Sequence, residues 1–139
     1  MPVRVITVIK SLYMREPIRD RERLQHIIEA ADLIIKYTTN VTYEEFLSDK
    51  LLYGALVYYT MVIGEASYKL SPEFTSHYND TPWADIAGMR HHIVHGYYKV
   101  DNRVVWNIIT SDIPTLHDRV QQYLNEINWE QWESQMKQY

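Results

Sequence analysis

The spacing of apolar residues along this chain predicts helices rather than strands. Between Arg19 and Tyr37 apolar side chains recur every three or four residues, which is typical of an amphipathic helix with one buried face. These positions are Leu24, Ile27, Ile28, Ala31, Ile34 and Ile35. The segment from Leu51 to Leu70 is apolar on almost all sides, so it is predicted to be the most buried helix. Glu65 lies within it, and a carboxylate among so many apolar side chains needs a partner.

Local signals divide the rest of the chain into shorter helices. Thr42-x-x-Glu45 is a capping box that places Phe46 toward the core. Ser71-Pro72 and Thr81-Pro82 each combine a cap residue with a proline suited to the first helical turn, and the second of these helices is expected to end at Gly96.

The C-terminal third continues this pattern. Asp101 or Asn102 is predicted to cap a short helix over residues 104–109. Asp112-Ile113-Pro114 is predicted to begin a last long helix that runs to Ile127, and the remaining residues look helical but mostly solvated. The predicted fold class is therefore all-α, an up-and-down bundle of about five helices.

Length and composition set the limits of this picture. The 139 residues suit one domain with a core of its own, and we divide them into an extension (1–13), a helical domain (14–127) and a polar tail (128–139). The absence of cysteine excludes disulfides, thiolate zinc sites and thiol nucleophiles. No segment has the apolar length of a membrane span or the pattern of a signal peptide, so we expect a cytoplasmic protein without membrane contact.

Basic charge is concentrated in one segment, from Gly88 to Arg103 (GMRHHIVHGYYKVDNR). It holds three of the six histidines, and its three basic residues stand against one aspartate, which gives a formal charge of +2. The whole chain carries −4, so the remainder sums to −6. The overall acidity argues against nucleic-acid binding through bulk charge, whereas this local concentration permits it.

Arg90 and His95 in this segment suit the cleavage of RNA. An imidazole that titrates near neutral pH can take the proton of a ribose 2′-hydroxyl, whose oxygen then attacks the adjacent phosphate. An arginine guanidinium can hold that phosphate and stabilise the charge that develops on it. Because the nucleophile belongs to the substrate, the reaction needs no metal and no other cofactor.

Two other interpretations of the histidines remain open. They can be surface residues favoured by the dipole at a helix C-terminus, or His91 and His95, spaced i,i+4, can bind a metal. The metal site lacks a third ligand nearby, so we expect none. For RNA cleavage, Arg90 and His95 lie about 140° apart around a regular helix. They converge only if the helix frays near Gly96 or if a second protomer completes the site.

Arg90-x4-His95-x-Tyr97 lies within a wider pattern along the chain. The pattern comprises IIEAADLI in the first helix, EEF at 44–46, IGEASYKLS at 63–71, PWADIAGMR at 82–90, VDNRVVWNII at 100–109 and DIPTL at 112–116. In order and spacing it resembles the HepT-like toxins of the HEPN superfamily, whose motif is R-x4-H-x-Y. The resemblance covers roughly residues 14–127.

The resemblance implies a homodimeric, metal-independent endoribonuclease with Arg90 and His95 as catalytic residues. It further implies the toxin of a toxin–antitoxin pair, whose antitoxin is a minimal nucleotidyltransferase, MntA. In such pairs the antitoxin AMPylates the motif tyrosine, here Tyr97, and the added phosphates would repel RNA. Asn often follows the motif arginine in these toxins, whereas this chain has His91, to which we assign a supporting role.

Further residues are candidates for the same site. Glu65 is the candidate to pair with Arg90 and orient it, although another donor would equally satisfy Glu65. Lys99 and Arg103 are candidate contacts to RNA phosphates, and Trp83 is expected to be a core anchor rather than a base-stacking platform. The competing hypothesis is a catalytically inert helical dimer that binds a nucleotidyltransferase or nucleic acid.

Overall fold

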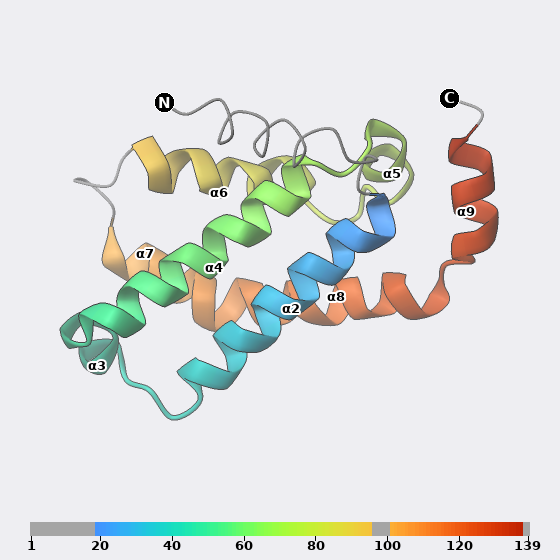
Figure 1. Cartoon of the computed structure of the whole chain (residues 1–139). Coiled ribbons are helices and arrows are strands. Elements are labelled where there is room, and N and C mark those ends of the chain that lie inside the picture. The colour runs from blue at the N-terminus through green and yellow to red at the C-terminus, as the bar shows by residue number, and fades with distance from the viewer. Residues whose placement is uncertain (1–18, 96–100, 138–139) are drawn as a thin grey trace, which may run out of the picture.

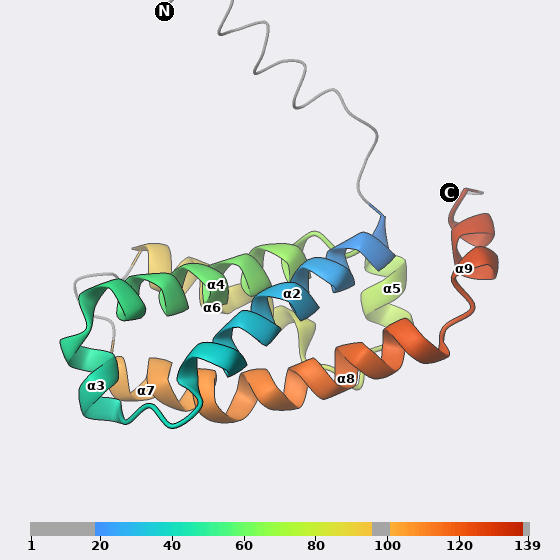
Figure 2. The same ribbon diagram turned by 60° about the horizontal axis from the view of Figure 1, so that its bottom comes forward.

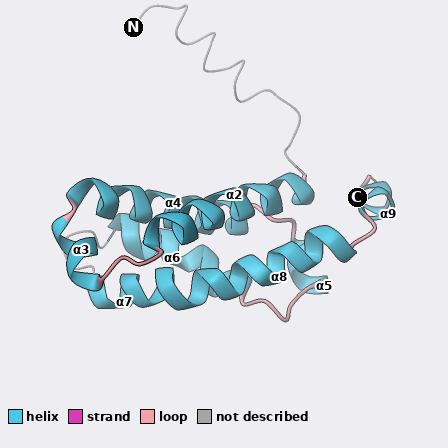
Figure 3. Cartoon of the chain, turned by 90° about the horizontal axis from the view of Figure 1, so that it is seen from below, coloured by secondary structure: helices cyan, strands magenta, loops and turns pink. Residues whose placement is uncertain are grey.

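The computed structural model describes residues 19–95 and 101–137, except for the side chains of residues 94 and 95. Every regular element in these ranges is helical, which confirms the predicted all-α class (Figure 3). The long helices are α2 (Asp20–Thr38), α4 (Lys50–Tyr68), α6 (Trp83–His95) and α8 (Ile113–Glu126). The shorter elements are α3 (Tyr43–Ser48), α5 (Pro72–His77), α7 (Asn102–Asn107), the π-helix η1 (Ile108–Asp112) and α9 (Trp129–Met136).

The long helices pack around one hydrophobic core. α4 lies against both α2 and α6, and α2 also packs against α8 (Figures 1 and 2). The apolar stripe predicted for α2 forms its buried face, with Leu24, Ile27 and Ile34 fully buried. The facing helices contribute Leu56, Ile63, Ile109, Ile113 and Val120. None of the helices in the described ranges is long and apolar enough to cross a membrane.

Side-chain caps begin several of the helices where the sequence predicts them. The Thr42 hydroxyl accepts a hydrogen bond from the backbone N–H of Glu45, and Phe46 beneath it is fully buried. The Ser71 hydroxyl caps α5 in the same way. At α7 the structure decides between the two candidates, because the Asp101 carboxylate accepts from the first backbone N–H groups.

Thr81 does not have the predicted role of a side-chain cap. Its buried hydroxyl lies 2.6 Å from the hydroxyl of Tyr123 on α8 and forms a hydrogen bond with it. α6 begins at Trp83, whose indole N–H donates to the carbonyl of Tyr78 and whose side chain is buried. Trp83 is thus confirmed as a core anchor, and it ties the start of α6 to the core.

α4 is not the most buried helix, although its apolar sequence predicts this, because α2 is equally long and has as many buried residues. Its residues Leu56, Thr60 and Ile63 are buried, but Leu51 and Tyr58 are 88% and 59% exposed. The reason is geometric: the neighbouring α2 and α6 cover only part of the circumference of the helix. α4 therefore presents an apolar face to solvent within one chain.

α8 begins at Ile113 and ends at Glu126, close to the predicted bounds, but no break separates it from the preceding helices. α7, η1 and α8 follow one another without an intervening loop, and Asp112 makes no side-chain cap hydrogen bond. Pro114 has no backbone N–H to donate to the preceding turn, and the wider π turn accommodates this missing bond. The residues predicted to begin a helix therefore lie within one continuous helical run.

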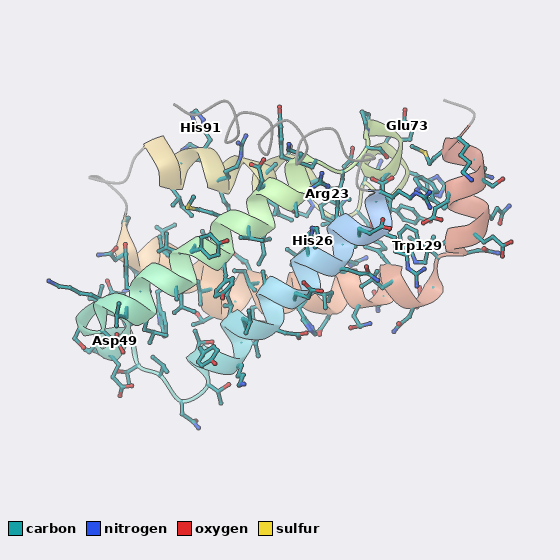
Figure 4. The ribbon with its side chains drawn as sticks, in the orientation of Figure 1. Arg23, His26, Asp49, Glu73, His91 and Trp129 are labelled. Atoms are coloured by element: carbon teal, nitrogen blue, oxygen red, sulfur yellow. The ribbon has the colours of Figure 1, made fainter. Side chains whose placement is uncertain are left out.

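α9 lies at the end of the bundle, where Trp129 at its start is labelled in Figure 4. Trp129 is buried, and its ring centroid lies 6.2 Å from that of Phe74. The indole N–H of Trp132 donates to Asp20, whose carboxylate also accepts from the backbone N–H of Ser71. The tail is helical and largely exposed, as expected, but Trp129 belongs to the core and Trp132 packs against it.

Candidate active site

The two helices that carry the candidate residues meet closely at Gly64. A Cβ atom built at this buried glycine of α4 would lie 3.0 Å from the Cβ of Arg90 and 3.2 Å from the carbonyl oxygen of Ile86, both on α6. Carbon atoms in contact normally lie about 3.5–4.0 Å apart. The missing side chain therefore permits the close approach of α4 and α6, and this approach fixes the backbone position of Arg90.

Arg90 forms an ion pair with Glu65 across this helix contact. Nη1 of Arg90 lies 3.0 Å from Oε2 of Glu65, which confirms the pair predicted from the sequence. Lys69 approaches the other carboxylate oxygen at 3.8 Å. The apolar character of its helix suggests that Glu65 is buried. Its side chain is instead 44% exposed, so the carboxylate is not buried.

An aromatic ring holds the guanidinium from a second direction. Cζ of Arg90 lies 4.7 Å from the ring centroid of Tyr68, a cation–π contact. Tyr68 is three residues after Glu65, so both side chains project from neighbouring positions on α4 toward Arg90. Tyr68 was not among the residues predicted from the sequence, and its i,i+3 spacing from Glu65 is the signal that identifies it.

The anchored guanidinium is suited to binding an anion. Its side chain is 36% exposed, and its ion pair with Glu65 involves Nη1. Nε is buried and has no hydrogen-bond partner among the described residues. A guanidinium that a carboxylate and a ring already orient has less conformational freedom to lose when it binds a phosphate.

Two of the three clustered histidines are described in full, and both are exposed. His91, labelled in Figure 4, and His92 follow Arg90 on α6, and their rings lie edge to face with centroids 5.9 Å apart. No group of three His, Cys, Asp or Glu suited to a metal occurs among the described residues. The alternative metal site of His91 and His95 is not tested, because the side chain of His95 lies outside the described part of the structure.

The other half of the predicted motif lies at or beyond the end of α6. His95 is the last residue of the helix, and its side chain lies outside the described part of the structure. Because α6 is α-helical up to this residue, its backbone position is about 140° around the axis from Arg90. Gly96, Tyr97 and Lys99 also lie outside the described residues, so their roles stay predictions.

Arg103, the second candidate for phosphate contact, stacks on an aromatic ring. Its Cζ lies 3.8 Å from the ring centroid of Tyr43 on α3, although the side chain remains exposed. The neighbouring Asn102 accepts a hydrogen bond from the hydroxyl of Tyr53 on α4. These contacts attach the start of α7 to α3 and α4, and a role for Arg103 in binding RNA stays a prediction.

Comparison with known proteins bears directly on the family of the chain. The family model described as "Ribonuclease HepT-like" matches residues 27–123. The chain belongs to the HepT-like ribonuclease family. "Putative RNase TTE0752" of Caldanaerobacter subterraneus subsp. tengcongensis is 34% identical over 106 residues, which cover 76% of this chain and 95% of that protein. "Probable ribonuclease HepT" of Thermococcus cleftensis is 36% identical over 96 residues, which cover 69% and 87% respectively. No solved structure matches the chain.

The HepT-like match includes the parts of the fold that position Arg90. It begins within α2 and ends within α8, so it includes α4, α6 and the contact at Gly64. α9, with Trp129 and Trp132, lies beyond the match. The ion pair between Glu65 and Arg90 thus belongs to the HepT-like part of the chain.

Proposed function

We propose that this HepT-like chain is a metal-independent endoribonuclease whose catalytic residues are Arg90 and His95. The observation that carries the proposal is the guanidinium of Arg90, which Glu65 and Tyr68 orient on the helix that ends at His95. The family match and the relatives, which are named as RNases, support the same reaction class.

The proposed reaction uses the ribose of the substrate as its own nucleophile. His95 takes the proton of the 2′-hydroxyl while the 2′-oxygen forms a bond to the adjacent phosphorus. Arg90 binds the non-bridging oxygens and stabilises the charge of the phosphorane. The bond between phosphorus and the 5′-oxygen then breaks, and that oxygen takes up a proton, for which His91 is the candidate donor. The products are a 2′,3′-cyclic phosphate and a 5′-hydroxyl.

Glu65 acts in this scheme as a positioning residue. Its carboxylate holds Nη1 of Arg90 and leaves the exposed part of the guanidinium for the phosphate. Both side chains are partly exposed, so the ion pair contributes little to folding stability. The role of the pair is therefore to keep the guanidinium in a productive orientation.

The site is proposed to form between two chains of a homodimer. The backbone positions of Arg90 and His95 lie about 140° apart around a single α6, which favours a site that a second chain completes. A two-fold axis beside α6 would bring Arg90 of one chain toward His95 of the other. The exposed apolar face of α4, with Leu51 and Tyr58, is a surface that such a dimer can bury.

A mixing experiment tests the catalytic residues and the shared site together. Arg90→Ala and His95→Ala chains are each expected to leave RNA intact in EDTA. After the two are refolded together, about half of the dimers should be heterodimers. Each heterodimer has one intact site of two, made from Arg90 of one chain and His95 of the other. About a quarter of the wild-type activity should therefore return. Cleavage by either variant alone would contradict the assignment of residues. No recovery from heterodimers isolated by two affinity tags would contradict the shared site.

The biological role we propose is that of a toxin inactivated by a cognate MntA-like nucleotidyltransferase. The nucleotidyltransferase would transfer AMP from ATP to the hydroxyl of Tyr97 and release pyrophosphate. The added phosphate beside Arg90 would repel RNA. Intact-mass measurement after incubation with that enzyme and ATP should show added AMP units. The same units on a Tyr97→Phe variant would exclude Tyr97 as the sole acceptor.

A further inference from the structure

A cavity of about 500 Å³ opens where the end of α4, α5 and the first turns of α6 meet. Figure 1 shows these three segments converging near the top of the molecule. The flat or small side chains of Tyr68, Trp83 and Ala87 form part of the wall. Asn79 and Asp85 are exposed and line the same cavity. The opening therefore combines apolar surfaces with hydrogen-bonding groups.

Tyr68 connects this cavity to the candidate active site. Its ring lines the cavity and also lies 4.7 Å from Cζ of Arg90. The side chain is 62% exposed, so the ring remains accessible beside the guanidinium. In single-stranded RNA each phosphate joins two riboses, and each ribose carries a base. A phosphate held by Arg90 would therefore place a neighbouring base at Tyr68.

The wall of the cavity offers what an unstacked base requires. Bases in single-stranded RNA bind proteins by stacking on aromatic rings and by hydrogen bonds along their edges. A carboxylate accepts from the amino group of cytosine, and an asparagine amide pairs with the amino edge of adenine. Asp85 forms no ion pair or hydrogen bond with any other described residue, so its carboxylate is available to an amino group.

One residue that lines the cavity, Ser67, has a buried hydroxyl without a hydrogen-bond partner among the described residues. Ser67 is only 2% exposed. By contrast, the Thr60 hydroxyl of the same helix donates to the Leu56 carbonyl at 2.8 Å. Buried polar groups that the protein leaves unpaired are unusual and commonly mark a place for water or ligand.

We infer that this cavity is a subsite for an adenine or cytosine base next to the scissile phosphate. The inference rests on the proposed ribonuclease function and adds a preference for part of the substrate. The base stacks on Tyr68, and its amino group donates to Asp85 or Asn79. Uracil has carbonyl groups where the other two bases carry the amino group, so it meets the Asp85 carboxylate unfavourably.

The test measures binding separately from cleavage. Fluorescent 2′-O-methyl oligonucleotides of A, C or U have no 2′-hydroxyl, so the protein can bind them but not cut them. Anisotropy titration of the full chain should give about tenfold tighter binding of oligo(A) or oligo(C) than of oligo(U). Tyr68→Ala should weaken binding of oligo(A) by about 5- to 140-fold, the equivalent of one lost base stack, and Tyr68→Phe should restore it.

Matched variants separate the effect of removing the subsite from the effect of removing any exposed tyrosine ring or any one carboxylate. Tyr37→Ala removes another exposed tyrosine that also carries a cation over its ring, and it should leave binding unchanged. Asn79→Ala combined with Asp85→Ala should abolish the preference over oligo(U). Asp112→Ala, which removes one carboxylate outside the cavity, should keep the preference.

Two results would overturn the inference. One is equal affinity for the three oligonucleotides, and the other is a Tyr68→Ala variant that binds like Tyr37→Ala. If the wild-type chain cuts RNA but either result is obtained, the subsite is wrong and the ribonuclease function stands. If the base preference is present but RNA stays intact, the subsite is supported and the proposed ribonuclease function fails.

Discussion

Replacing Gly64 with alanine is expected to force α6 away from α4. The new methyl group would meet Cβ of Arg90 at 3.0 Å and the Ile86 carbonyl oxygen at 3.2 Å, and neither atom can rotate out of the way. Overpacking of this kind costs about 1–3 kcal/mol. A helical glycine replaced by alanine otherwise gains about 0.8–1.0 kcal/mol. The free energy of unfolding should therefore fall by up to about 2 kcal/mol in the variant.

Gly54→Ala is the matched control, because Gly54 lies on the same helix and a Cβ there meets no heavy atom within 4 Å. This variant should gain about 0.5–1 kcal/mol. Urea unfolding followed by far-UV circular dichroism measures both, and their difference isolates the clash. A Gly64→Ala variant as stable as Gly54→Ala would refute the argument that the helix contact requires a glycine.

Three further changes test separate contacts. Glu65→Gln should lower kcat for RNA cleavage by up to about 100-fold through misplacement of Arg90, and should change the free energy of unfolding by less than about 1 kcal/mol. Asp20→Asn weakens the acceptor of the Trp132 indole and should lower the free energy of unfolding by about 1–3 kcal/mol in urea titrations. Burial raises the pKa of Tyr123, so the stability it contributes is complete below about pH 10 and is lost as pH rises through the folded-state pKa. Tyr123→Phe should flatten this alkaline loss in urea midpoints measured across that range.

Each of these changes has a control in the chain. Lys69→Gln leaves the contact between Glu65 and Arg90 in place, so an equal loss of kcat would contradict the positioning role. Asp112→Asn changes an exposed carboxylate and should leave stability unchanged, unlike Asp20→Asn. An alkaline loss that stays as steep in Tyr123→Phe as in the wild type would show that Tyr123 does not cause it.

The sequence was sufficient wherever one local rule decides the outcome. The three- and four-residue spacing of Leu24, Ile27 and Ile34 determines the buried face of α2. Thr42 begins α3 because its hydroxyl satisfies a backbone N–H that the helix leaves unpaired. Glu65 was identifiable as a partner for Arg90 from its place in an apolar helix, although its side chain is 44% exposed and the carboxylate is not buried.

The remaining features depend on how helices meet, which periodicity does not encode. Tyr58 of α4 is exposed because the helices beside it cover only one side. Trp129 is buried because α9 lies across Phe74, a contact between residues far apart in the sequence. Pro114 resembles a helix start, but the wider turn of η1 lets the helical run continue through it. Tyr68 reaches Arg90 only because Gly64 brings the two helices close together.

The most direct measurement is the chemistry of the RNA ends that the purified, unmodified protein produces in EDTA. Attack by the 2′-hydroxyl under the control of Arg90 and His95 predicts 2′,3′-cyclic phosphate and 5′-hydroxyl ends, and none of either from Arg90→Ala. Ends that carry a 3′-hydroxyl and a 5′-phosphate, cleavage that requires an added divalent cation, or RNA left intact would contradict it.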